Sequence, residues 1–444
     1  MTHTKEKFGM MLPIILLSYF MIVLDNSIVF TSTVKMAQDL HLNAPALSWV
    51  STAYTLTFGG LLLAAGRAGD LVDRKKIFLI GLLIFGISSL LVGLSMDGPM
   101  IIAMRALQGV GSAILAPTTL ALLMDSYTGY TRTRAITAYG ATAGLGSSFG
   151  LVIGGLITSL WTWRMGFFIN VPVSLGLIML TLRHVSSIPA VKKGKIDIWG
   201  TVLSVVGLSA LIYAIVGDTG QVPAAIAAVV MLSVFILVEK YSRQPMMPLR
   251  IFADWERSNA YAARFFFMAA MMSYWFLTPQ AMQRVYGFSP LMAGVAFLPM
   301  TVLQFLAALQ TSRLTARWGN TRVLISGVVL TLIGPILSTV IGIRSGYLWA
   351  IAIPMVFLGI GQGLTLSPLT VAAIANTDPA IAGSASGVVN MIHQIGGSVG
   401  LAVTVAISAL WSNAVTSYTV ATGIVSGYLF LAAMAALMIE IKNN

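Results

Sequence analysis

The sequence predicts an all-α polytopic membrane protein with fourteen transmembrane helices and both termini in the cytoplasm. Three observations lead to this fold class. The 444 residues are 57% hydrophobic and only 9% charged, whereas a soluble domain carries about 25% charged residues. Apolar runs of about 20 residues, the length that crosses a bilayer, recur along the chain. Lysine and arginine gather in alternate connections, which is the pattern that orients membrane helices.

The apolar runs define the expected membrane spans in chain order. They are 8–32, 46–66, 76–96, 99–124, 134–159, 163–183, 196–217, 222–241, 257–280, 290–312, 321–343, 346–370, 381–408 and 416–440. The connections between them are short, so we expect no soluble domain there. The leading segment MTHTKEKF precedes an apolar run too long for a signal peptide, without a small-residue cleavage site. We therefore expect it to be a cytoplasmic tail.

The positive charges fix the expected topology. With the N-terminus inside, twenty Lys and Arg residues fall in cytoplasmic segments and three in outer loops. Three more, Arg105, Arg164 and Arg264, fall within spans. This asymmetry supports an even number of helices with both termini inside. The net charge of +12 is then a topology signal, and we set aside nucleic acid as a partner.

The two halves of the chain resemble each other. The fourth span carries GVGSAILAPTT at 109–119, and the twelfth carries the similar GQGLTLSPLT at 361–370. Internal repeats of this kind are typical of transporters. We expect three parts: an N-terminal six-helix bundle at 1–185, two extra central helices with linkers at 186–250, and a C-terminal six-helix bundle at 251–444.

Asp25 lies in the first span, within the otherwise apolar run FMIVLDNSIVF. An ionised Asp there costs about 2.5–3.5 kcal/mol on insertion scales. Ser18, Asp25 and Ser32 are seven residues apart, so they share one helical stripe, expected to face the bundle interior. Desolvation favours the neutral acid, whereas water or a cation favours the carboxylate. Either Asp25 carries protons and attracts lipophilic cations, or it is a structural residue bonded to a neighbouring helix. We favour proton coupling, because no other acid lies deep in a span.

Two of the three arginines within spans lie more than one turn from the span's start. Arg105 is followed by Gln108 and Gly109 and could pair with a carbonyl or polar side chain or help to relay protons. The alternative is that its side chain snorkels to the near interface. We favour a functional Arg105, and for Arg264, near the start of the ninth span, we favour snorkelling.

His393 lies near the middle of the thirteenth span. Histidine titrates near neutral pH, so it could be a second proton site. The alternative is a hydrogen-bonding residue beside Asn390 and Gln394. We leave both interpretations open and include His393 with Asp25 and Arg105 among the proton-coupling candidates.

The ninth span, RFFFMAAMMSYWFLTPQ, is rich in methionine and aromatic residues. Such side chains form adaptable apolar surfaces and can bind cations through their rings. Packing against lipid is the alternative for most of them. The expected substrate cavity comprises Gln108, Asn170, Met271, Tyr274, Trp275, Asn390 and Gln394.

The loop after the second span reads GRAGDLVDRKK, residues 66–76. Its glycines allow close backbone approach, and its acids and bases can form ion pairs where helices meet at the cytoplasmic face. The alternative is a basic loop that only sets topology. We expect a cytoplasmic gate that latches one conformation, formed by Gly66, Arg67, Gly69, Asp70, Asp73 and Arg74.

This loop resembles the signature loop of the major facilitator superfamily. Nearly the whole chain resembles the fourteen-helix drug:proton antiporter family within it. The other motifs that carry the resemblance are LDNSIV (24–29), RALQGVG (105–111), WRMGFFINVP (163–172) and KIDIWG (195–200). The resemblance implies two six-helix bundles around a central cavity, alternating access, and a role in proton relay for Arg105.

The sequence departs from this family pattern in three places. Leu151 occupies the position of a proline in the fifth-helix motif, and His393 replaces an arginine common in the thirteenth helix. The loop RLTARWGN after the tenth span keeps Arg313, Arg317 and Gly319 but has no acid. We therefore expect the latch to be degenerate in the second half.

Several function classes are excluded by composition and motifs. The chain has no cysteine, so thiol catalysis and cysteine-based metal sites are excluded, and its four histidines lack metal-ligand spacing. There is no phosphate-binding G-x-x-x-x-G-K-[ST] run and no nucleophile, base and acid constellation. We therefore expect no enzyme activity, no metal and no cofactor, with a proton gradient as the energy source, although sodium stays open.

These features together predict a proton-coupled multidrug exporter of lipophilic, often cationic compounds in a bacterial cytoplasmic membrane. Its partners would be small-molecule drugs, protons and membrane lipid, and a monomer suffices because one chain contains both halves. The first alternative is a narrow-substrate exporter of one antibiotic, metabolite or lipid, or an importer. The second is a membrane receptor or scaffold, and a channel is a weaker third.

Overall fold

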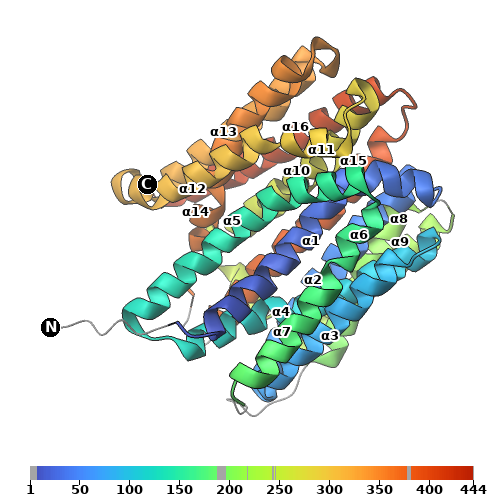
Figure 1. The fold of residues 1–444 in the computed structure, drawn as a ribbon. Helices are drawn as coiled ribbons and strands as arrows, with labels where there is room; N and C mark the ends of the chain where they lie inside the picture. Colours follow the sequence, from blue (N-terminus) through green and yellow to red (C-terminus); the bar gives the residue numbers. More distant parts are fainter. Residues whose placement is uncertain are drawn as a thin grey trace.

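The computed structural model describes residues 8–187, 197–217, 219–242, 245, 247–377 and 382–443. Within these ranges all regular structure is helical. The long helices lie alongside one another in one bundle (Figure 1). The first helix begins and the last helix ends at the same end of this bundle, as expected if both termini are on one side of a membrane (Figure 1).

The helices follow the predicted order of spans. The N-terminal half contains α1 (Met11–Asp39), α2 (Ala44–Leu71), α3 (Arg74–Gly93), α4 (Gly98–Ser126), α5 (Gly129–Leu160), α6 (Trp163–Phe168) and α7 (Asn170–His184). The central pair is α8 (Ile198–Val216) and α9 (Gln221–Tyr241), followed by a 3₁₀ turn at Leu249–Ala253. The C-terminal half contains α10 (Trp255–Tyr286), α11 (Pro290–Val295), α12 (Leu298–Trp318), α13 (Asn320–Ile341), short 3₁₀ and π segments at Ile343–Ser345 and Leu348–Ala352, α14 (Ile353–Ala373), α15 (Ala382–Ser408) and α16 (Ala414–Asn443).

Twelve helical segments of the described residues are long and apolar enough to cross a membrane. The other two predicted spans correspond to α5 and α10, which are also long helices of 32 residues each. Helix α10 is the more polar because it includes Glu256, Arg257 and Arg264. The multi-pass helical architecture is therefore confirmed, and the count of fourteen spans stays a prediction.

Two predicted spans are each broken into two helices. The sixth is interrupted at Ile169, between α6 and α7, one turn before Pro172. The tenth is interrupted at Ala296 and Phe297, just before Pro299. Proline lacks an amide hydrogen and clashes with the carbonyl of the preceding turn, so it favours a helix start, although α4, α10, α13 and α14 each keep a proline in their interior. The first of these breaks places Asn170 at a helix start.

The repeat predicted from sequence recurs in the packing. In the N-terminal half α1 packs on α5, and α4 packs on both α2 and α3. In the C-terminal half α10 packs on α15, and α14 packs on both α12 and α13. The two halves are thus built from the same helix pairings.

The halves meet along two seams. In the first, α2 packs on α15, and α8 contacts both of these helices through an apolar cluster that contains Leu56, Leu208 and Ala402. In the second, the end of α5 packs on α11 so closely that a Cβ added to Gly294 would lie 2.4 Å from the carbonyl oxygen of Leu151. Under the predicted topology, this second seam lies toward the outer side.

Candidate functional site

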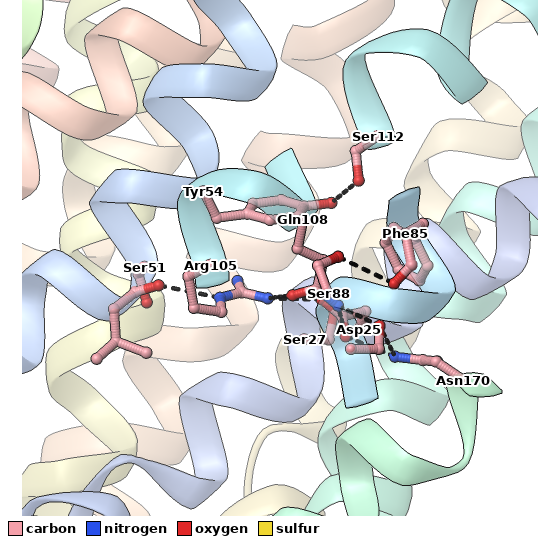
Figure 2. A network of polar contacts seen from close by, with 12 residues as sticks. Asp25, Ser27, Ser51, Tyr54, Phe85, Ser88, Arg105, Gln108, Ser112 and Asn170 are labelled. Carbon is pink, nitrogen blue, oxygen red and sulfur yellow. Dashed lines mark hydrogen bonds and ion pairs between the residues drawn. The ribbon is translucent and has the colours of Figure 1, made fainter. Parts of the chain in front are cut away.

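The carboxylate of Asp25 is held by three donors from two other helices (Figure 2). Its Oδ2 accepts from Arg105 Nη1 at 2.7 Å. Its Oδ1 accepts from Gln108 Nε2 at 2.9 Å and from Asn170 Nδ2 at 2.7 Å. The side chain is 0% exposed. The buried charge is therefore compensated by a cation and two amide donors.

Arg105 is equally buried and is fixed on several sides. Besides Asp25, its guanidinium donates to the carbonyl oxygen of Val50 at 3.0 Å and to Gln108 Oε1 at 2.6 Å. It also stacks over the ring of Tyr54, 4.2 Å from the centroid. The alternative that Arg105 snorkels to the membrane interface is therefore wrong in this structure, because its charge is paired with Asp25 inside the bundle.

Buried hydroxyl groups extend the network around Asp25 and Arg105, and one of them contacts both amides. Ser89 on α3 accepts from Gln108 Nε2 at 2.7 Å and lies 3.4 Å from Asn170 Nδ2. The Tyr54 hydroxyl lies 2.7 Å from Ser112 Oγ (Figure 2). Sequence reasoning missed Ser89 and Tyr54, since serine and tyrosine in an apolar helix carry no distinctive spacing.

The local sequence explains why these groups converge. Arg105, Gln108 and Ser112 are spaced three and four residues apart, so they lie along one face of α4. Gly109 lets α2 approach this face: a Cβ there would lie 2.4 Å from the Tyr54 carbonyl oxygen. Asn170 reaches the carboxylate from the first residue of α7, directly after the break that precedes Pro172.

The electrostatics of the site depend on the protonation of Asp25. An ion pair this deeply buried is tolerated because each charge compensates the other, and loss of one partner costs about 3–5 kcal/mol. Protonation of the carboxylate leaves the Arg105 cation buried without its counter-charge. Protonation would therefore remove the charge compensation that this arrangement provides.

The stripe of Ser18, Asp25 and Ser32 is wholly buried, as expected for an interior face. Ser32 Oγ lies 2.7 Å from Thr158 Oγ1 on α5. The direct hydrogen-bond partners of Asp25 all come from the N-terminal half. The expected direct contact between this carboxylate and a cationic drug is therefore closed in this arrangement, because Arg105 occupies that position.

His393 is not brought together with Asp25. It lies on α15 in the C-terminal half, and its Nδ1 atom is buried without a hydrogen-bond partner among the described residues. Its neighbour Gln394 packs on Gly59 of α2, whereas Asn390 is exposed and donates to the Ser386 carbonyl oxygen at 3.2 Å. A proton-coupling role for His393 and a substrate role for these two amides stay predictions.

Arg264 differs from the expectation. Its side chain is buried and donates to α14 through the Leu366 carbonyl oxygen at 3.3 Å and Thr370 Oγ1 at 3.1 Å. The prediction that it snorkels is wrong, because the side chain is buried and its Nη1 atom donates to acceptors on a neighbouring helix. Arg164 lies in the first turn of α6, at the start of the sixth span as predicted, and pairs with the partly exposed Asp39 at 3.3 Å.

The cavity candidates of α10 are buried rather than lipid-facing. Met271, Tyr274 and Trp275 belong to one core cluster. The Trp275 ring lies 5.9 Å from that of Phe297 and 6.0 Å from that of Phe30 on α1. Aromatic side chains from both halves therefore meet here, at the junction where a central substrate cavity is expected.

The predicted gate loop forms an ion pair and a helix cap within the N-terminal half. Arg74 pairs with Asp125 near the end of α4. Asp73 caps α3 by accepting from the Lys75 amide at 2.8 Å, and it also accepts from the Ser187 hydroxyl. Sequence reasoning missed Asp125, because it lies far along the chain at an ordinary helix end.

The other gate candidates lie at the end of α2 that packs on α4. A Cβ added to Gly66 or Gly69 would lie 3.8 Å from Pro117 and 3.9 Å from Thr118 respectively, so this end of α2 packs on α4. Arg67 is half-buried, and the side chain of Asp70 lies outside the described part of the chain. No group of three or more potential metal ligands occurs among the described residues.

Comparisons with known proteins agree with this architecture. A family model described as the Major Facilitator Superfamily matches residues 15–401. The crystal structure of PepTSo, a POT family transporter, superposes with a TM-score of 0.72 at 15% identity, and the match covers 98% of this chain and 99% of that one. At this identity the likeness concerns the fold alone.

Two relatives by sequence are resistance proteins. The puromycin resistance protein pur8 of Streptomyces alboniger is 32% identical, over 96% of this chain and 90% of its own length. The multidrug resistance protein Stp of Mycobacterium tuberculosis is 28% identical, over 90% of this chain and 75% of its own length. Both matches span the two halves and the central helix pair.

Proposed function

This chain belongs to the Major Facilitator Superfamily, and we propose that it is a proton-coupled multidrug exporter that works by alternating access. It transports rather than catalyses, and it is a multi-pass protein of a bacterial cytoplasmic membrane. Its substrates are lipophilic, often cationic compounds. The observation that carries the proposal is the fully buried Asp25 carboxylate, paired with Arg105 and bonded to Gln108 and Asn170.

The buried pair supplies a physical basis for coupling. While Asp25 is ionised, Arg105 binds it and the site is electrically compensated. A proton that arrives from the outer side neutralises the carboxylate and releases Arg105, which destabilises this arrangement of helices. Return of the proton to the cytoplasm restores the pair. Because the protonated and ionised forms of Asp25 stabilise different conformations in this proposal, a proton gradient can drive the conformational change without a cofactor.

In this proposal drug binding is linked to the proton cycle because the drug and the proton bind the same carboxylate. Once protonation has released Arg105 from Asp25, a lipophilic cation that reaches the cavity can replace the proton at the carboxylate and contact the aromatic surface around Trp275. It competes with the proton, so that one group serves both ligands in turn. Export rather than import is supported by the relatives, because a resistance protein in a transporter superfamily protects the cell by removing the drug.

Purified protein in liposomes with an inside-acidic proton gradient tests the proposal. Ethidium uptake is measured for wild type, Asp25→Asn and the control Asp39→Asn, which removes a partly exposed carboxylate from the same helix. We expect gradient-driven uptake by wild type and Asp39→Asn and its loss in Asp25→Asn. Equal uptake by wild type and Asp25→Asn would remove Asp25 from coupling and direct attention to His393.

A narrow-substrate exporter is the second candidate. The name of pur8 refers to resistance to a single antibiotic, puromycin. The same liposomes distinguish the two functions when a panel of cationic, zwitterionic and anionic compounds replaces ethidium. Uptake of one chemical class alone supports the narrow exporter, whereas uptake of several unrelated lipophilic cations supports the multidrug one.

A further inference from the structure

One turn of α2 contacts both the ion pair and the opposite half of the protein. On one side, Arg105 donates to the Val50 carbonyl oxygen at 3.0 Å and stacks over the ring of Tyr54. On the other side, Thr55 Oγ1 lies 2.6 Å from Ser398 Oγ on α15. Both hydroxyl groups are buried. This second contact is a side-chain hydrogen bond between the N-terminal and C-terminal halves.

The contact between α2 and α4 is too close to absorb a movement of Arg105. A Cβ added to Gly109 would lie 2.1 Å from Thr57 Oγ1 and 2.4 Å from the Tyr54 carbonyl oxygen. In addition, Thr57 Oγ1 donates across the contact to the Ala106 carbonyl oxygen at 2.7 Å. Closely packed helices respond by discrete shifts rather than by smooth deformation. A displacement at Arg105 is therefore passed to α2.

When the carboxylate is neutral, Arg105 can move toward an unpaired hydroxyl group on α2. Its Nη2 atom is buried without a hydrogen-bond partner among the described residues, and so is the Oγ atom of Ser51. Ser51 directly follows Val50, whose carbonyl oxygen already accepts from Arg105 (Figure 2). Loss of the Asp25 charge favours a shift of the guanidinium toward this turn of α2, since a buried cation seeks acceptors.

We propose that Thr55 and Ser398 are positioning residues that transmit the protonation state of Asp25 to the seam between the halves. Protonation releases Arg105 from Asp25, the cation moves toward Ser51, and α2 shifts against α15. A hydroxyl pair at 2.6 Å weakens once α2 moves by a fraction of an ångström, because hydrogen bonds depend steeply on distance and angle. The present arrangement of the halves then loses one of the bonds that stabilise it. This inference rests on the proposed role of Asp25.

The test uses the absence of cysteine from the chain. Spin labels at Tyr130→Cys and Trp318→Cys, two exposed positions at corresponding ends of the two halves, report the separation of the halves by electron paramagnetic resonance. Populations of the two conformations are measured between pH 5 and pH 8 in wild type, Thr55→Val, Ser398→Ala and the double variant. Ser273→Ala is the matched control, since the Ser273 bond to Thr404 on α15 lies within one half.

We expect Thr55→Val and Ser398→Ala each to raise the population of the alternative conformation about fivefold, the effect of one neutral hydrogen bond. The double variant should shift it no further, because both substitutions remove the same bond. Thr55→Ser, which retains the hydroxyl, should restore the wild-type pH profile. Ser273→Ala should leave that profile unchanged.

Two results separate this inference from the proposed function. If wild type responds to pH and Asp25→Asn does not, but Thr55→Val follows the wild-type profile, the link through α2 is overturned while Asp25 coupling stands. Shifts no larger than that of Ser273→Ala, or additive shifts in the double variant, overturn it as well. A wild type that ignores pH instead contradicts proton coupling at Asp25.

Discussion

Asp25 Oδ2 and Arg105 Nη1 lie 2.7 Å apart, and neither side chain is exposed to solvent. The two residues come from α1 and α4, so their pairing fixes the relative position of two helices in the N-terminal half. A buried ion pair of this kind is costly to break. A proton that binds Asp25 removes the charge that holds Arg105.

The first prediction concerns the stability of the pair. Arg105→Gln leaves Asp25 buried without a cation, so we expect a loss of about 3–5 kcal/mol in the free energy of unfolding. The double variant Asp25→Asn with Arg105→Gln removes both charges and should recover most of this loss. Thermal unfolding followed by tryptophan fluorescence measures both, and equal stability of the single and double variants would argue against a charge-compensated pair.

The second prediction compares two glycines. Gly109→Ala places a Cβ against the backbone of Tyr54, so we expect a poorly folded, inactive protein. Gly140→Ala, on α5, meets nothing within 4 Å and should be neutral or stabilising by up to about 1 kcal/mol. Detergent-solubilised yield and thermal unfolding are the readouts. If Gly109→Ala matched Gly140→Ala, the close contact of α2 with α4 would be disproved.

The third prediction addresses the gate loop. Arg74 pairs with Asp125 in a partly exposed position, so breaking the pair should change stability by less than about 1 kcal/mol. If the pair latches the cytoplasmic side, Arg74→Asp and Asp125→Arg should each reduce transport several-fold. The exchanged double variant should regain activity in the ethidium assay. If the double variant restored no transport, the loop would not act as a latch, and its basic residues would serve only to set the topology.

The fourth prediction concerns the aromatic surface at the junction of the halves. Trp275→Leu removes a ring that packs on Phe297 and Phe30, and with it a cation–π contribution of about 0.5–2 kcal/mol. We expect ethidium to bind about 2- to 30-fold more weakly in a fluorescence titration. Trp318→Leu, at the exposed end of α12, is the control. Identical affinities for the two variants would place the drug elsewhere.

The fold was predictable because membrane helices leave strong signals in sequence. Long apolar runs located the helices, and the distribution of Lys and Arg gave the orientation. The breaks at Ile169 and at Ala296 were missed, although Pro172 and Pro299 stand just after them. Proline alone does not show whether a helix bends or stops, since that depends on whether neighbouring groups bind the freed carbonyls.

The candidate site was predicted residue by residue but not as one network. Asp25 and Arg105 were assigned to proton coupling and Gln108 and Asn170 to a substrate cavity, whereas the structure joins all four. Their meeting depends on helix packing, which a single sequence does not encode in any local pattern. For the same reason Ser89 was missed. Arg264 was misjudged because its acceptors on α14 lie about a hundred residues away.

The most direct measurement of the central claim is proton release on drug binding. A lipophilic cation is added to purified wild type, Asp25→Asn and Asp39→Asn in weakly buffered detergent solution with a pH indicator, at several pH values between 5 and 8. If drug and proton compete for Asp25, wild type and Asp39→Asn release protons as the drug binds and Asp25→Asn releases none. Equal proton release by Asp25→Asn and wild type would contradict the account.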